Sequence, residues 1–141
     1  DNSMKKLPAT FSDLNALKEI NLDYNRMKKF PLTFLDMPEL ESVHLTSNKI
    51  HELPGEVGKM NGLTALTLDE NPIENLPESF FLLPNLRFLD VSGTNILQIS
   101  SSIALFDKLE YLNLGDLGLS KEQQNQVRSY FQTAASLQII F

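Results

Sequence analysis

An apolar pattern that recurs every 23 residues constrains the fold of this chain more than any other feature. In the clearest copy, Leu63, Leu66 and Leu68 are followed by Asn71 and by an apolar–proline step at 76–77. Copies in the same phase, the last of them incomplete, begin at Leu17, Leu40, Leu63, Leu86 and Leu109. One copy alone has too few apolar side chains to offset the conformational entropy lost on ordering its backbone. The copies must therefore stack on one another, which predicts a solenoid.

Within each copy, two branched aliphatic residues stand two positions apart, as do the leucines at 66 and 68. This period predicts a short strand with the leucines inside and the intervening residue outside, and successive strands are expected to form a parallel sheet. An amide side chain follows three of the strands and can bond backbone groups freed at the turn. These residues are Asn25, Asn48 and Asn71, with Asn2 at the equivalent place in the N-terminal half-repeat and Thr94 in the fourth full copy.

On the far side of each copy, the proline step turns the chain and a further apolar row follows. This row is expected to stack as a second hydrophobic spine of Phe11, Phe34, Val57, Phe80 and Ile103. A second group of apolar side chains on the same side is expected to be exposed to solvent, namely Leu35, Phe81, Leu82 and Leu105.

The pattern L-x-x-L-x-L-x-x-N-x-L resembles the leucine-rich-repeat family from Asn2 to about Leu119. Its 23-residue form, with L-P-x-x-h after the strand, is similar to short bacterial leucine-rich-repeat proteins and to the intracellular Ras-associated class. The resemblance implies an α/β solenoid, a horseshoe with a parallel concave β-sheet and an irregular or short-helical convex side. It says little about function, because function in such a fold depends on the surface residues.

The repeat divides residues 1–141 into segments of a single domain. We expect a partial repeat or N-terminal cap at 1–16, full repeats at 17–39, 40–62, 63–85 and 86–108, a half-repeat at 109–119 and a C-terminal cap at 120–141. The chain starts in the middle of a repeat, which favours a fragment of a longer chain, with an improvised cap as the alternative. At the other end, Ser120 and Gln123 form a capping-box signature for a helix, and alternating residues after Leu137 predict a closing strand.

The outward positions of the strands and of the turns after them carry six carboxylates and no lysine or arginine. They are Glu19, Asp23, Asp69, Glu70, Asp90 and Asp116. Solubility alone would explain this surface, and a site for a basic partner would also explain it. Phe88 and Tyr111 are adjacent in one outward column, which indicates an aromatic anchor for a partner. The alternatives are a pair that only stabilises the sheet and a pair covered by Ile140 from the closing strand.

Six of the 12 basic residues lie at equivalent positions just past the asparagines, at the N-terminal end of one edge. They are Lys5, Lys6, Arg26, Lys28, Lys29 and Lys49. A solvated charged face and a site for an anionic surface are both consistent with this arrangement.

The sequence offers little for catalysis. It has no cysteine, phosphate loop or zinc motif, and His44 has no serine and aspartate in a plausible triad order. We therefore expect no enzyme, cofactor or metal site, and the net charge of −6 disfavours nucleic acid. No apolar stretch is long enough for a transmembrane segment.

The sequence thus predicts a protein-binding module that recognises a partner protein through its concave sheet, and a basic partner would match the acidic face. The alternatives are a scaffold within a longer repeat protein, self-association through the open N-terminal end, and adhesion to an anionic surface through the basic edge. The resemblance favours a bacterial protein that is exported or surface-associated, with an intracellular location as the alternative. The candidate partner-binding residues are Asp23, Tyr24, His44, Asp69, Glu70, Phe88, Asp90, Tyr111 and Asn113.

Overall fold

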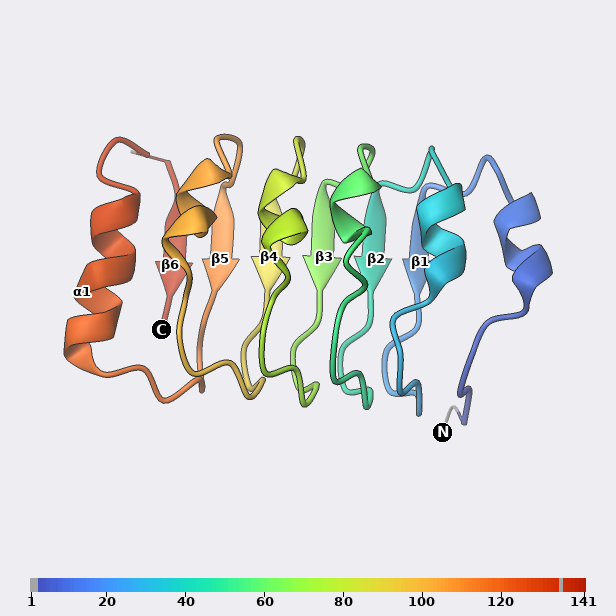
Figure 1. The fold of residues 1–141 in the computed structure, drawn as a ribbon, viewed down its shortest axis with the longest axis horizontal. Coiled ribbons are helices and arrows are strands. Elements are labelled where there is room, and N and C mark those ends of the chain that lie inside the picture. Colours follow the sequence, from blue (N-terminus) through green and yellow to red (C-terminus); the bar gives the residue numbers. More distant parts are fainter. Residues whose placement is uncertain (1–2, 135) are drawn as a thin grey trace.

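A computed structural model describes residues 3–134 and 136–141. Asn2, expected to match the other turn asparagines, lies outside the described residues. The chain forms a solenoid in which six parallel strands make one sheet in sequence order (Figure 1). The strands are β1 (Glu19–Asn21), β2 (Ser42–His44), β3 (Ala65–Thr67), β4 (Phe88–Asp90), β5 (Tyr111–Asn113) and β6 (Gln138–Ile140). The leucine-rich-repeat solenoid expected from the sequence is confirmed.

The sheet register follows directly from the 23-residue period. The central residue of each of the first four strands lies beside the residue 23 positions later, as Leu66 lies beside Leu89. These central side chains point inward and are buried, whereas the residues on either side of them point outward. Equivalent outward residues therefore form straight columns across the sheet, and these columns make up the candidate binding face.

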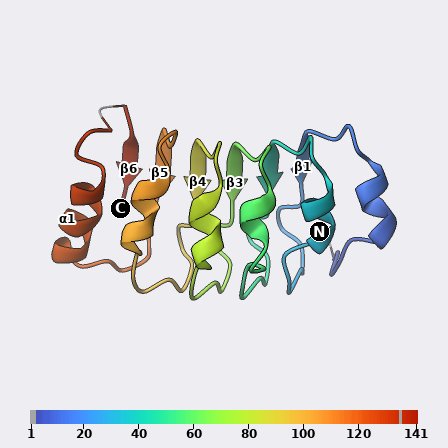
Figure 2. The same ribbon diagram turned by 45° about the horizontal axis from the view of Figure 1, so that its top comes forward.

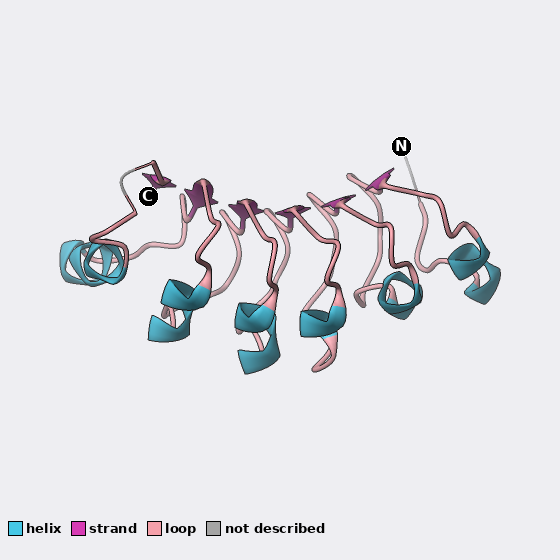
Figure 3. Ribbon diagram, turned by 90° about the horizontal axis from the view of Figure 1, so that it is seen from above, coloured by secondary structure: helices cyan, strands magenta, loops and turns pink. Residues whose placement is uncertain are grey.

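Short 3-10 helices cover the opposite side of the stack (Figure 3). They are η1 (Ala9–Asp13), η2 (Leu32–Asp36), η3 (Val57–Lys59), η4 (Glu78–Leu82) and η5 (Ser101–Leu105). The expected spine along this side is buried at Phe34, Val57, Phe80 and Ile103, and half-buried at Phe11. Seen from above, the strands line one side of a shallow arc and the helices line the other.

The expectation of an exposed Phe81 is wrong, because this side chain is only 3% exposed. Its ring meets Phe80 edge-on and also packs beside Phe106 of the next repeat, with centroids 5.8 Å apart in both pairs. Leu82 and Leu105 are exposed as expected, and Leu35 is half-buried.

Each end of the stack is closed by a different segment (Figure 2). At the N-terminal end, η1 packs against η2, and Ile20 and Leu22 are buried. At the C-terminal end, the expected helix is α1 (Lys121–Tyr130), which begins with the Ser120–Gln123 capping box and buries Val127. The closing strand β6 pairs with β5 as expected. Within the described residues, no helix is both long and apolar enough to cross a membrane.

Candidate partner-binding face

The outward columns are held in place by the buried asparagines beneath them. Asn71 is 1% exposed, and its Oδ1 accepts a hydrogen bond of 2.9 Å from the backbone N–H of Ile50 in the preceding repeat. Its Nδ2 donates to the carbonyls of Leu45 and Leu68, so a single side chain joins two repeats. Asn48 and Asn25 make equivalent bonds. The sheet is therefore a rigid platform for the side chains that face outward.

The turn after each strand adopts a left-handed backbone conformation that sequence reasoning missed. Positive φ angles of 53° to 61° recur at the same repeat position, in Tyr24, Ser47, Glu70, Gly93 and Asp116. The left-handed region is costly for residues other than glycine, by roughly 1–2 kcal/mol each. The glycine at position 93 of this column was the available signal, since glycine adopts such angles without strain.

Phe88 and Tyr111 form a stacked aromatic pair on the outward face, as their column predicts. Their ring centroids are 4.3 Å apart and the ring planes differ by 3°. Both side chains are half-buried. On the β6 side, Gln138 is the direct neighbour of Tyr111, and Ile140 is the direct neighbour of Asn113. On the other side, Phe88 lies beside the small Ala65 of β3.

A fixed polar cluster adjoins this aromatic pair. Asn113 donates from Nδ2 to Oδ2 of Asp90 across 2.9 Å, and Ser92 donates to Oδ1 of Asp90 from both its backbone N–H and its hydroxyl. The Oδ1 of Asn113 in turn accepts the N–H of Gly115. These bonds hold Asp90 and Asn113 in fixed orientations next to the stacked rings, so four of the candidate residues lie together in adjacent columns.

Asp69 and Glu70 extend the negative charge onto β3 and its turn. Thr46 donates a 2.7 Å hydrogen bond from its hydroxyl to Oδ1 of Asp69, and Ser47 bonds Glu70. Burial raises the pKa of Asp69 above its ordinary value, the Thr46 hydrogen bond opposes this shift, and the charges of Asp90 and Glu70 raise the pKa further. Asp90 and Glu70 therefore both repel the charged form of Asp69.

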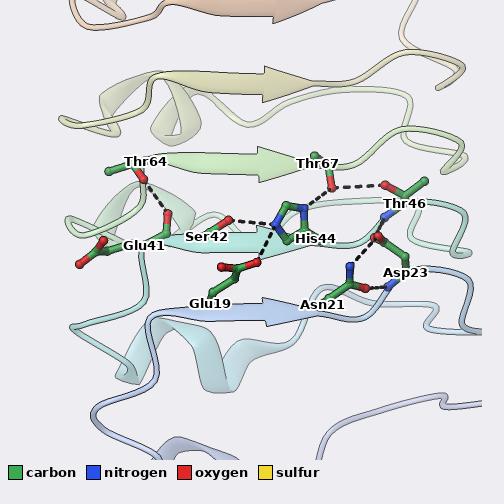
Figure 4. Close-up of polar contacts among 9 residues, drawn as sticks. All are labelled: Glu19, Asn21, Asp23, Glu41, Ser42, His44, Thr46, Thr64 and Thr67. Atoms are coloured by element: carbon green, nitrogen blue, oxygen red, sulfur yellow. Dashed lines mark hydrogen bonds and ion pairs between the residues drawn. The ribbon is translucent and has the colours of Figure 1, made fainter.

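His44 lies in a separate polar network on β1–β3 (Figure 4). Its Nε2 is 3.0 Å from the Ser42 hydroxyl and 3.7 Å from a carboxylate oxygen of Glu19, and its Nδ1 is 3.4 Å from the Thr67 hydroxyl. A catalytic triad needs the acid and the nucleophile on opposite ring nitrogens. Here Ser42 and Glu19 face the same nitrogen, so these two residues lack the geometry of a Ser–His–acid triad.

Asp23 and Tyr24 lie at the rim of β1, away from the aromatic pair. The Asp23 carboxylate accepts the backbone N–H of Thr46 at 2.8 Å and the side-chain amide of Asn21 at 3.0 Å. Its oxygens thus stabilise the turn. Tyr24 is 69% exposed. Three strand spacings of about 4.8 Å separate β1 from β4, roughly 14 Å in all. The structure therefore divides the predicted residues into an aromatic and acidic group on β3–β5 and a polar group on β1–β2.

Across the described residues, no group of three or more His, Asp or Glu side chains is arranged to hold a metal ion. The outward face of the sheet presents the stacked Phe88–Tyr111 pair, oriented carboxylates and hydrogen-bonding groups.

Comparisons with known proteins give the following matches. The sequence profile described as "Leucine rich repeat" matches residues 1–50 and 38–96. No curated protein matches the chain. Among solved structures, an LRR protein of Leptospira interrogans matches 99% of this chain with a TM-score of 0.91 and 25% sequence identity. An internalin of Listeria monocytogenes matches 96% of it with a TM-score of 0.74 and 20% identity. The chain spans 35% of the first protein and 44% of the second.

Proposed function

The chain belongs to the leucine-rich-repeat family, and we propose that it is a protein-binding module whose concave sheet recognises a basic partner through β3–β5. The stacked Phe88–Tyr111 pair is the observation that carries this proposal. Aromatic side chains presented outward from a rigid surface are the usual anchors of protein interfaces. A six-stranded sheet is roughly 24 Å across, at about 4.8 Å per strand. It can accommodate a standard interface of about 800 Å² per partner.

The surroundings of Phe88 favour a cationic group in the partner. One side of the Phe88 ring is stacked on Tyr111, whereas the other side adjoins Ala65, which contributes a single methyl group. A planar guanidinium can stack on an aromatic ring in such a space. Asp90, in the adjacent outward column, and Asp69 would supply the opposite charge. The partner is therefore expected to present an arginine that stacks on Phe88 above Ala65.

The test uses peptides selected from a random displayed library on the immobilised chain, with affinities then measured by calorimetry. Phe88→Ala and Tyr111→Ala should each weaken binding by more than about 1 kcal/mol, or roughly fivefold. Ala65→Leu should also weaken it by filling the space beside the ring. Leu82→Ala is the matched control, because it removes an exposed apolar side chain from the opposite side of the stack.

A second pair of variants tests the charge. Asp69→Asn with Glu70→Gln should weaken binding of the same peptides, whereas Asp36→Asn with Asp107→Asn removes equal charge on the helix side and should leave it unchanged. The proposal fails if the selected peptides bind the Phe88→Ala/Tyr111→Ala double variant as tightly as the wild type.

A further inference from the structure

A second charged surface lies along the edge of the solenoid where the chain leaves the strands, the lower edge of Figure 1. We call it the basic strip, and all its side chains are exposed. It consists of Lys5, Lys6, Arg26, Lys28, Lys29 and Lys49. These are half of the 12 basic residues of the chain, gathered in its first 49 positions.

Backbone hydrogen bonds between repeats hold the basic strip together. The N–H of Arg26 donates to the Met4 carbonyl at 2.9 Å, which fixes Arg26 beside the peptide group that leads into Lys5. One repeat later, the N–H of Lys49 donates to the Met27 carbonyl at 2.9 Å, beside the peptide group that leads into Lys28. Residues from three successive turns of the solenoid therefore lie side by side.

The buried asparagines beneath the strip strengthen this arrangement. Asn25 accepts the N–H of Met4, and Asn48 accepts the N–H of Met27, both at 3.0 Å. Met27 itself is 1% exposed, so the backbone that carries Lys28 and Lys29 is anchored in the core. The strip is thus a preorganised row of cations on a fixed backbone.

The charges of the strip are not neutralised within the described part of the chain. Lys18–Glu41, His44–Glu19 and Arg87–Glu110 are the ion pairs found there, and none involves a residue of the strip. Without the strip, 6 basic and 18 acidic side chains would leave the rest of the chain at −12. Further along the edge, His51 and Glu52 occupy the positions that Lys28 and Lys29 hold one repeat earlier, so the strip ends there.

We propose that the basic strip binds a linear polyanionic polysaccharide bearing sulfate or carboxylate groups. The strip extends over two repeat spacings, about 10 Å. An extended anionic plane such as a bilayer would also approach the acidic remainder of the chain, whose repulsion extends over about 8 Å at physiological salt. A narrow polymer can follow the strip and avoid that repulsion. The strip carries no aromatic side chain on which a nucleic-acid base could stack.

The probe is a heparin dodecasaccharide titrated into the chain by calorimetry, with neutral dextran as the blank. Reversing two strip charges, Lys28→Glu with Lys29→Glu, should weaken binding at least about tenfold. The matched control, Lys59→Glu with Lys121→Glu, changes the net charge equally at exposed positions outside the strip and should retain affinity. A second strip pair, Lys5→Glu with Lys6→Glu, must reproduce the loss, and thermal melts establish that each variant is folded.

Equal weakening by the strip and control variants would overturn the proposal, because it would show an effect of net charge alone. Tighter binding to phosphatidylserine vesicles or to a thymidine oligonucleotide than to the dodecasaccharide would also overturn it, as would an absence of heparin binding. Phe88→Ala should leave heparin binding unchanged. The proposal for the basic strip and the proposal for the concave sheet can therefore be refuted independently.

Discussion

Removing the amide of Asn71 should be one of the most destabilising substitutions in the chain. Asn71→Ala leaves the N–H of Ile50 and the carbonyl of Leu68 without a hydrogen bond, because neither has another partner among the described residues. The Leu45 carbonyl keeps the amide of Asn48. Each buried orphaned group costs about 1–3 kcal/mol, so the variant should lose about 2–6 kcal/mol.

Thr94 provides an internal comparison, since it occupies the same repeat position. Its hydroxyl donates to the Val91 carbonyl at 2.7 Å. The N–H of Ile73 donates to the backbone carbonyl of Asn71, whereas the equivalent N–H in earlier repeats donates to a turn asparagine side chain. Thr94→Ala therefore orphans one group and should cost about 1–3 kcal/mol. Asn71→Thr can retain a bond to the Leu68 carbonyl and should fall between wild type and Asn71→Ala.

The assay is urea unfolding followed by far-ultraviolet circular dichroism on all four proteins. The slope of the unfolding free energy against urea concentration should be the same for all four proteins, since each exposes the same surface on unfolding. If Asn71→Ala costs no more than Thr94→Ala, or if Asn71→Thr is as unstable as Asn71→Ala, the assignment of two orphaned groups to Asn71 is wrong.

Further substitutions test the packing, the electrostatics and the association rate. Gly58→Ala should be strongly destabilising, because an added Cβ would lie 2.1 Å from the Ser79 carbonyl oxygen, whereas Gly55→Ala meets no atom within 4 Å and should change the melting temperature little. The pKa of Asp69 is raised in the folded chain. Its contribution to folding stability is therefore fully present below the ordinary Asp pKa and is lost as pH rises through the raised pKa. Asp69→Asn, which keeps an acceptor for Thr46, should therefore gain stability relative to wild type at neutral pH and lose that gain in acid; a pH-independent difference in melting temperature would contradict this. For the selected peptides, the association rate should fall as salt rises from low to physiological concentration, and a rate independent of salt would exclude electrostatic steering.

The sequence was sufficient to predict the sheet and the aromatic pair because both follow from the period. A 23-residue repeat in parallel register places Phe88 directly beside Tyr111, and no knowledge of the loops is needed. The same reasoning correctly predicted that the turn asparagines bond backbone groups freed at the turn.

The features that the sequence did not predict depend on contacts that the period does not determine. Phe80 and Phe81 are adjacent in sequence, and the repeat pattern assigns only Phe80 to the buried spine. Phe81 is also buried because it packs beside Phe106, and this contact depends on how η4 and η5 pack. The structural role of Asp23 was not predicted either: its carboxylate accepts a hydrogen bond from the Thr46 N–H beside the left-handed residue Tyr24. Backbone angles of this kind leave a trace in sequence only where glycine occupies the position.

The most direct test of the proposed function maps where a bound peptide contacts the folded chain. A selected peptide would be titrated into the ¹⁵N-labelled protein while amide chemical shifts are recorded. We expect the largest changes in β3–β5 and the turns after them, at Ala65, Thr67, Asp69, Phe88, Asp90 and Tyr111. Changes concentrated on η4 and η5 around Leu82 and Leu105, with the amides of the concave sheet unmoved, would contradict the claim that this sheet is the recognition surface.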